Sequence, residues 1–417
     1  MKRTARDNRD LPHPKPVERI ELSQEHAGPR LAAAAALLLL GAGLLAYTVM
    51  GLLTPDTGWQ TVQADSGASC AEDFTFLYQA DSSAEAKGVA SLYSDACRKA
   101  FQLFHNRMAF DGVTNVYTIN RHPNEVLEVD EALYEAFAVI VGSGRRELYL
   151  GPVYERYGGV FSCEDDVQLV DFDPRLSEDV RQEYAGVLVY ANDPQAVSLE
   201  LLGEGRIRLN VSEAYLDWAE EEEITSFIDF SWMQNAFVAD YLAGELTARG
   251  YTKGTLSSYD GFIRNLDGRD VGYTYPIYHR QEDAIYPAAQ MQYHGPVSLV
   301  RMRDYPLNQE EFQWYYELRT GEVRTLYLDM ADALCKSSID TLVCCSREKG
   351  CAQILMEMIP VYIADDFREE AVAALAEEGI QSVYCRGWEV LHTEPGLTLE
   401  SLFDDGDRSY TVRQIGR

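Results

Sequence analysis

The sequence predicts a single α+β domain that follows one transmembrane helix near the N-terminus. Residues 31–53 form a continuous run of 23 apolar or small residues without a charge. After this run, segments with a helical period of 3.6 mix irregularly with short β-type segments. Such mixing is typical of α+β domains and differs from the regular alternation of βαβ units. We therefore expect one helix in a membrane and one mixed domain outside it.

The apolar run and its flanks predict how the chain is oriented. As a helix, residues 31–53 would extend about 34 Å, which is enough to cross a bilayer with some tilt. Residues 1–30 contain seven Lys or Arg, whereas residues 54–86 contain none. The positive-inside rule then makes residues 1–30 a basic cytoplasmic leader and places the rest of the chain outside the cell membrane. A cleaved signal peptide is the alternative, but a 30-residue leader is longer than is typical of one.

Composition excludes some classes of partner. Hydrophobic residues make up 46% of the chain and charged residues 25%, as in ordinary globular proteins. The 36 basic and 67 acidic residues give a net charge of −31, most of it after the apolar run. This charge opposes binding to nucleic acid or to an anionic membrane surface. All eight cysteines also follow the run, where disulfides can persist, although their pairing cannot be deduced from one sequence.

The exterior part divides into three segments. Residues 54–71 are polar and small and are expected to be a tether, residues 72–402 have globular patterning, and residues 403–417 look like a loose tail. Helical periodicity predicts helices over 86–104, 130–140 and 366–378. Short β-type runs predict strands over 187–191, 207–211, 297–302 and 325–328.

The most informative segment is residues 227–242. A strand-like run ends at Asp229, and a helical pattern follows with a stripe made of Phe230, Met233, Phe237 and Tyr241. A strand that leads into a helix is a common place for a ligand site, because the first N–H groups of a helix can bind an anion. The turn between them contains no glycine, lysine or histidine. The pattern indicates the frame of a site from which the reactive groups have been replaced.

Four segments follow one another in an order typical of one enzyme family. Residues 114–120 read Thr-Asn-Val-Tyr-Thr-Ile-Asn, and residues 150–158 read Leu-Gly-Pro-Val-Tyr-Glu-Arg-Tyr-Gly. Residues 228–242 come next with Ile-Asp-Phe at their start, and residues 319–321 read Arg-Thr-Gly. In this order the chain resembles the ApbE-like FAD:protein FMN transferase family over about residues 72–400.

The resemblance implies a fold and an activity. Members of this family have a T-fold-related α+β domain and are exported, magnesium-dependent enzymes of bacteria. They transfer FMN from FAD to a Thr or Ser of a partner, such as an exported or membrane redox protein. FAD and Mg²⁺ are therefore the cofactors, and a membrane or exported protein the partner, that the resemblance implies for this chain.

By motif position, the resemblance assigns cofactor binding to Asp229, Asn235, Asp260 and Gly261. The family has a glycine pair two residues after the first aspartate and a lysine at the position of Asn235. Here the pair is Ser-Trp, ending at Trp232. Glycines would let the backbone approach a flavin, and Trp cannot do so. Asn offers a neutral amide where lysine would offer a charge to the pyrophosphate.

The family's later motifs are also altered. The Ser-Gly-Asp-Tyr motif reads Met-Arg-Asp-Tyr over residues 302–305, and the histidine of the segment before residues 319–321 is replaced by Trp314. The altered motifs lie among aromatic residues, namely Trp232, Phe237, Tyr259, Phe262, Trp314 and Tyr315. These rings suit a stacked ligand, and they are equally explained by core filling where a cofactor lies in the family.

The metal motif of the family, Asp-x-x-x-Thr, fits this chain in two registers. One keeps the carboxylate at Asp332 but places Lys336 at the threonine, and the other keeps the hydroxyl at Thr341 but places Ser337 at the aspartate. An insertion that retains both Asp332 and Thr341 as ligands is the third possibility. Magnesium normally takes a carboxylate, and a lysine beside Asp332 would repel the ion and could pair with the carboxylate instead.

These departures define two hypotheses for function. The first is a pseudoenzyme without catalytic residues that serves as a binding or interaction module at the cell membrane. The alternative is an active Mg²⁺-dependent flavin transferase, which would have to position its phosphates without the lysine and with an altered metal motif. A third possibility, flavin attachment to this chain itself, rests on the Gly-Val-Thr sequence at residues 112–114.

Overall fold

The computed structural model describes residues 58–415, apart from residues 66, 68, 282–283 and 395–397. The expected leader, the apolar run over residues 31–53 and the start of the tether lie outside the described residues. Within the described part, none of the helices combines the length and the apolar character needed to cross a membrane.

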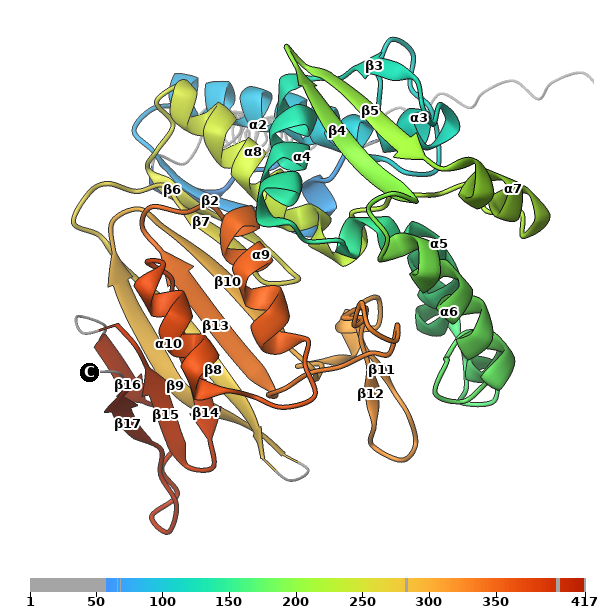
Figure 1. Cartoon of the computed structure of the whole chain (residues 1–417). Helices are drawn as coiled ribbons and strands as arrows, with labels where there is room; N and C mark the ends of the chain where they lie inside the picture. Colours follow the sequence, from blue (N-terminus) through green and yellow to red (C-terminus); the bar gives the residue numbers. More distant parts are fainter. Residues whose placement is uncertain (1–57, 66, 68, 282–283, 395–397, 416–417) are drawn as a thin grey trace, which may run out of the picture. The chain divides into compact units, whose positions relative to one another are not determined.

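A nine-stranded sheet forms the centre of the described part (Figure 1). Its strands, in spatial order, are β1 (Gly58–Thr61), β2 (Phe74–Ala80), β6 (Gly254–Ser258), β7 (Phe262–Asn265), β10 (Val297–Arg303), β13 (Thr341–Ser346), β14 (Gln381–Arg386), β15 (Glu389–His392) and β17 (Thr411–Gln414). Neighbouring strands are antiparallel except for the β15–β17 pair. Strands β2 and β6 are adjacent in space, although most of the helices lie between them in the sequence.

Helices cover one face of this sheet, and a second sheet covers the other. Helix α9 (Cys351–Tyr362) contacts β7, β10 and β13, and α8 (Gln234–Ala248) contacts β6 and β7. Further helices on this side are α2 (Ser83–Phe104), α4 (Glu131–Ser143) and α10 (Glu369–Glu377) (Figure 1). The second sheet has the order β16-β9-β8, formed by β16 (Thr398–Ser401), β9 (Ala284–His294) and β8 (Gly272–Gln281).

The two coverings create two hydrophobic cores, and the central strands belong to both. Along β13, Leu342 and Cys344 pack into the core under the helices, whereas Val343 and Cys345 pack into the core under the second sheet. Side chains of a strand alternate between its faces, so a strand buried on both sides needs apolar residues at every position. The four central residues of β13, Leu-Val-Cys-Cys, meet this need.

The remaining elements form a peripheral part before α8. They are α3 (Val116–Arg121), β3 (Val126–Glu128), α5 (Gly151–Tyr157), α6 (Glu178–Ala191), β4 (Val197–Gly203), β5 (Arg206–Val211) and α7 (Glu213–Glu221). Strands β3, β5 and β4 pair into a small antiparallel sheet. A short hairpin of β11 (Tyr316–Glu317) and β12 (Val323–Arg324) precedes β13.

Most expected elements are confirmed, with two corrections among the strands. The helices expected over 86–104, 130–140 and 366–378 correspond to α2, α4 and α10, and the strands expected over 207–211 and 297–302 to β5 and β10. The strand expected over 187–191 is wrong, because these residues end helix α6. Periodicity alone cannot separate a short buried run of a helix from a strand. The strand expected over 325–328 is also wrong, since only Leu328 there makes an isolated bridge, to Cys335.

The ends of the described chain are more ordered in structure than the expected tether and tail. Within residues 54–71, β1 pairs with β2. Within residues 403–417, β17 pairs in parallel with β15, and Tyr410 is buried in the second core. Both strands lie at the edges of the large sheet, where free N–H and C=O groups accept a partner strand. Four-residue strands of polar sequence leave little periodic pattern for a sequence analysis to detect.

One carboxylate connects α8 to the start of α9. Asp240 accepts hydrogen bonds from the backbone N–H groups of Cys351 at 2.8 Å and Ala352 at 2.9 Å, and it forms an ion pair with Arg264 of β7. The free N–H groups at a helix start favour an anion, and here the anion comes from another helix. Gly350 precedes α9 without a side chain, since a Cβ there would collide with the Asp240 carboxylate.

We predict that Asp240→Ala will lower the free energy of unfolding by about 2–4 kcal/mol, because it leaves Arg264 and the start of α9 without their anion. Urea unfolding monitored by circular dichroism measures this change. Glu245→Ala on the same helix is the matched control, because Glu245 makes none of these contacts. Equal losses in the two variants would contradict the role assigned to Asp240.

Candidate functional site

A carboxylate lies in the turn that leads into the short 3-10 helix Ser231–Met233, which precedes α8. Asp229 accepts hydrogen bonds from the backbone N–H of Ser231 at 2.8 Å and from the side chain of Asn106 at 2.6 Å. Asp229 itself is buried, and burial raises the pKa of its carboxyl to about 6. The expected strand before it is absent among the described residues, although the backbone N–H of Asp229 does bond to Leu148. A carboxylate at the turn before the helix Ser231–Met233 leaves little attraction for a second anion there.

The other three candidate cofactor residues lie together. The Asn235 amide donates to one oxygen of Asp260 at 3.0 Å, while the other oxygen of Asp260 is buried without a hydrogen-bond partner. Burial raises the pKa of the Asp260 carboxyl to about 6. Gly261 follows with a φ of +113°, and a Cβ there would lie 2.7 Å from the backbone oxygen of Arg301. Only glycine suits this turn, for both its conformation and its close approach to β10.

Aromatic side chains fill the space beside Asp260. We call this space the inner chamber, and its lining includes Trp232, Trp314, Tyr315, Tyr327 and Arg301. Its free volume is about 20 Å³, close to the space that one water molecule needs. Trp232 is 8% exposed and lies edge-on to Tyr327, with 4.9 Å between the ring centroids. The interpretation of these aromatics as core filling is therefore supported for the inner chamber.

An open groove lies on the other side of Arg301. We call it the aromatic groove; it has a volume of about 620 Å³, and its lining includes Trp59, Tyr273, Tyr275, Tyr293 and Arg301. Tyr273 and Tyr293 are stacked with centroids 5.7 Å apart, and Trp59 meets Tyr273 edge-on at 6.1 Å. Tyr273 and Tyr275 stand two residues apart on β8, so they face the same side of that strand.

Two arginines of β10 retain buried side-chain N–H groups that have no acceptor. Arg301 donates from Nη2 to the backbone oxygen of Tyr259 at 3.2 Å, but its buried Nε has no acceptor. Arg303 is 1% exposed and forms an ion pair with Glu311, yet its Nε and Nη1 also lack acceptors. A guanidinium that is only partly satisfied favours the approach of an anion. The Arg301 side chain lines both the inner chamber and the aromatic groove.

Sequence reasoning did not identify this groove. The family's lysine would lie at the position of Asn235. In this structure the positive charges come instead from Arg301 and Arg303, on the strand that ends at the altered Met-Arg-Asp-Tyr motif. The alternating tyrosines at 273 and 275 were the available signal for one aromatic face. Their pairing with Trp59, far away in the sequence, had no local signal.

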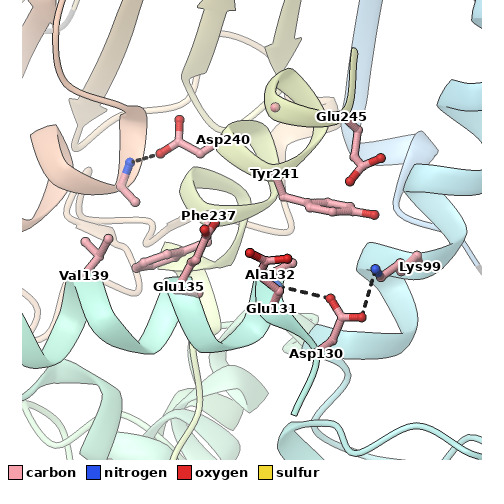
Figure 2. A pocket seen from close by; sticks show the side chains of 13 residues that line it. Lys99, Asp130, Glu131, Ala132, Glu135, Val139, Phe237, Asp240, Tyr241 and Glu245 are labelled. Atoms are coloured by element: carbon pink, nitrogen blue, oxygen red, sulfur yellow. Dashed lines mark hydrogen bonds and ion pairs between the residues drawn. The ribbon is translucent and has the colours of Figure 1, made fainter. Parts of the chain in front are cut away.

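A hollow of different character lies between α2, α4 and α8 (Figure 2). Its volume is about 340 Å³, and Figure 2 shows Asp130, Glu131, Glu135 and Glu245 around it. Lys99 on its wall pairs with Asp130 at 2.9 Å. The surplus of carboxylates would repel a phosphate or pyrophosphate group. This hollow is therefore not suited to a flavin nucleotide.

Comparison with known proteins gives structural relatives alone. Neither protein-family models nor curated protein sequences match the chain. Among solved structures, the ApbE protein from Thermotoga maritima is 12% identical, with a TM-score of 0.53 over 82% of this chain and 96% of that chain. The flavin transferase ApbE from Vibrio cholerae is 10% identical, with a TM-score of 0.50 over 79% of this chain and 93% of that chain.

The chain has an ApbE-like fold. The similarity covers most of both relatives, which confirms the expectation of an α+β fold of this type. At these identities the similarity establishes the fold alone, and the activity has to be argued from the site.

The two candidate metal residues of this ApbE-like domain have separate partners. Asp332 pairs with Lys336 at 2.8 Å, whereas the Thr341 hydroxyl bonds to the Tyr305 hydroxyl at 2.7 Å. Ser337 bonds instead to Asp304, at 2.7 Å. No set of three or more His, Cys, Asp or Glu side chains arranged for a metal ion occurs among the described residues. The residues present therefore do not form a Mg²⁺ site.

We predict that Asp260→Asn will stabilise the protein at neutral pH. The pKa of the buried Asp260 carboxyl rises from its ordinary 3.8 to about 6, so the wild type loses stability as pH rises through this window. Asparagine keeps the acceptor for Asn235 and carries no charge. Thermal unfolding should show a gain of about 1–3 kcal/mol above pH 6 that vanishes below pH 4.

Asp229→Asn is the matched control for this prediction. The pKa of Asp229 is also raised to about 6, but both of its oxygens accept hydrogen bonds, and asparagine has only one acceptor oxygen. Asp229→Asn should therefore give no gain at neutral pH. Equal stabilisation by both substitutions would contradict the role assigned to the unpaired oxygen of Asp260.

Proposed function

We propose that this chain is a bacterial, membrane-anchored, extracytoplasmic ApbE-like pseudoenzyme that binds a flat aromatic anion of the flavin nucleotide type. The aromatic groove is the observation that carries the proposal. Its volume of about 620 Å³ lies in the range of sites for small ligands. Its aromatic rings can stack on a planar ring system, and Arg301 can donate to a phosphate.

Three features argue against flavin transfer. The inner chamber beside Asp260 has no room for a flavin ring, because Trp232 and its neighbours fill it. Asp229 places a carboxylate at the turn that leads into the helices Ser231–Met233 and α8, and this charge disfavours an anion there. The ammonium of Lys336 occupies the carboxylate of the expected metal motif. Transfer of a phosphoryl-type group depends on positioning the reactants and on neutralising the phosphate charge. The filled chamber opposes positioning of the flavin, and the other two features oppose neutralisation of the phosphate charge.

The location of the protein follows from its sequence. The apolar run at residues 31–53 would anchor the domain, and the basic leader would keep residues 1–30 in the cytoplasm. The domain would then act at the outer side of the cell membrane, where its partner is a membrane or exported protein. The acidic surface argues against a nucleic-acid partner.

The alternative function is an active Mg²⁺-dependent FAD:protein FMN transferase. The relative from Vibrio cholerae is a flavin transferase, and the present chain shares its fold. An active enzyme would need the inner chamber to open and the ions to bind elsewhere. A transfer assay separates the two functions directly.

We expect the full-length protein, incubated with FAD, Mg²⁺ and a peptide that carries a Thr acceptor, to form no covalent flavin adduct. Fluorescence of the peptide after denaturing electrophoresis measures the adduct. An established flavin transferase in the same mixture is the positive control. Adduct formation by this chain that increases with time would overturn the pseudoenzyme proposal in favour of the alternative.

We expect FMN to bind the full-length protein and Arg301→Met to weaken this binding by roughly 10–100-fold, since the variant loses the guanidinium charge from the lining of the groove. Quenching of FMN fluorescence measures the affinity. Arg386→Met is the matched control, because Arg386 pairs with Glu369 at the surface, away from the groove lining. Equal affinities of wild type and Arg301→Met, or no binding at all, would contradict the groove as a flavin site.

A further inference from the structure

Three carboxylates from two segments converge on one ammonium. Lys336 Nζ lies 2.8 Å from Asp329 Oδ2, 2.8 Å from Asp332 Oδ2 and 3.0 Å from Asp365 Oδ1. An ammonium has three N–H donors, and this one has three carboxylate acceptors. The Lys336 side chain is 11% exposed, so its charge is held largely inside the protein.

The local backbone fixes two of these carboxylates. The second oxygen of Asp329 accepts from the backbone N–H of Ala331 at 2.8 Å, and the second oxygen of Asp332 accepts from that of Leu334 at 3.0 Å. Both aspartates therefore present one oxygen to the backbone of their own loop and the other to Lys336. The backbone N–H of Lys336 bonds to Tyr327, which holds the lysine in the same loop.

The third carboxylate ties this loop to a distant element. Asp365 lies three residues after the end of α9 at Tyr362. A second contact runs beside it, because Ser338 donates from its backbone N–H to the Tyr362 oxygen at 2.8 Å. The ammonium of Lys336 thus joins the loop at residues 329–336 to the end of the helix that covers β10 and β13.

We propose that Lys336 is a built-in cation that replaces a bound divalent ion in this ApbE-like fold. Asp332 is the carboxylate that the family motif would assign to Mg²⁺. Its Oδ2, the oxygen that does not bond to the backbone, pairs with the Lys336 ammonium. A divalent ion at this place would be repelled by Lys336. Magnesium also needs near-octahedral oxygen ligands, and the surrounding carboxylates are committed to other donors. The protein therefore keeps this loop in place without a metal.

This proposal predicts what happens when the charge is removed. Lys336→Met retains most of the side-chain volume but leaves Asp329, Asp332 and Asp365 facing one another without a cation. Three carboxylates at this spacing would attract a hard divalent ion, which prefers oxygen ligands. The wild-type protein should bind no divalent ion at this place, and the Lys336→Met variant should bind one. The inference does not depend on the groove or on any flavin chemistry.

The test measures thermal unfolding and Mn²⁺ binding of the full-length protein. Wild-type protein should have the same Tm in EDTA and in Mg²⁺ at equal ionic strength. Lys336→Met should have a lower Tm in EDTA, and added Mg²⁺ or Mn²⁺ should raise it in a saturable way, as expected for an ion that binds the folded state. Electron paramagnetic resonance of free Mn²⁺ should detect one additional bound ion per chain in the variant.

Lys349→Met is the matched control, because Lys349 is a lysine paired with a single carboxylate, Glu378, at 3.7 Å. It should gain no Mn²⁺ site. A folded Lys336→Met variant that binds no additional ion would overturn the proposal. So would a saturable Mn²⁺ site in the wild type that is lost in Asp332→Asn, and this measurement decides the question even if Lys336→Met does not fold.

Discussion

Strands β10, β13 and β14 are buried on both faces, and the arrangement of the other elements follows from that double burial. Their alternate side chains enter two different cores, so helices must cover one face and the β16-β9-β8 sheet the other. Helix α9 contacts β10 and β13, and its start is fixed by the carboxylate of Asp240 from α8. Its far end is fixed by the loop around Lys336. The charge pairs at both ends of α9 therefore hold this helix over the sheet, and packing against the sheet keeps the charged groups in contact.

The domain is strongly acidic, yet its buried charges are largely matched. Arg324 pairs with Asp173 at 2.6 Å where both side chains are almost fully buried, and Lys336 satisfies three carboxylates. Such pairing offsets the cost of taking charges out of water. Arg301 and Arg303 differ from these pairs, because each has buried N–H groups without an acceptor, and Arg301 also lines an open groove. A partly unmatched guanidinium beside an open groove is the physical reason to look for a ligand there.

The site combines polar contacts with a space that side chains fill. The bond from Ser231 to Asp229, the contact between Asn235 and Asp260, and the turn at Gly261 surround the inner chamber or lie near it. Large aromatic side chains occupy the space beside them, where each ring buries much apolar area. Burial of these rings both stabilises the fold and fills the inner chamber. The larger free volume lies in the aromatic groove, which Arg301 also lines.

The sequence by itself determined the α+β class and the positions of α2, α4, α10, β5 and β10, because each depends on periodicity. It also indicated that a lysine could neutralise Asp332. Only the tertiary structure decided that residues 187–191 are helical, that β1 and β17 complete the sheet, and that Asp329 and Asp365 join Asp332 around Lys336. The aromatic groove was decided there too. Contacts between residues far apart in the chain leave no periodic trace, since they arise only when separate elements pack.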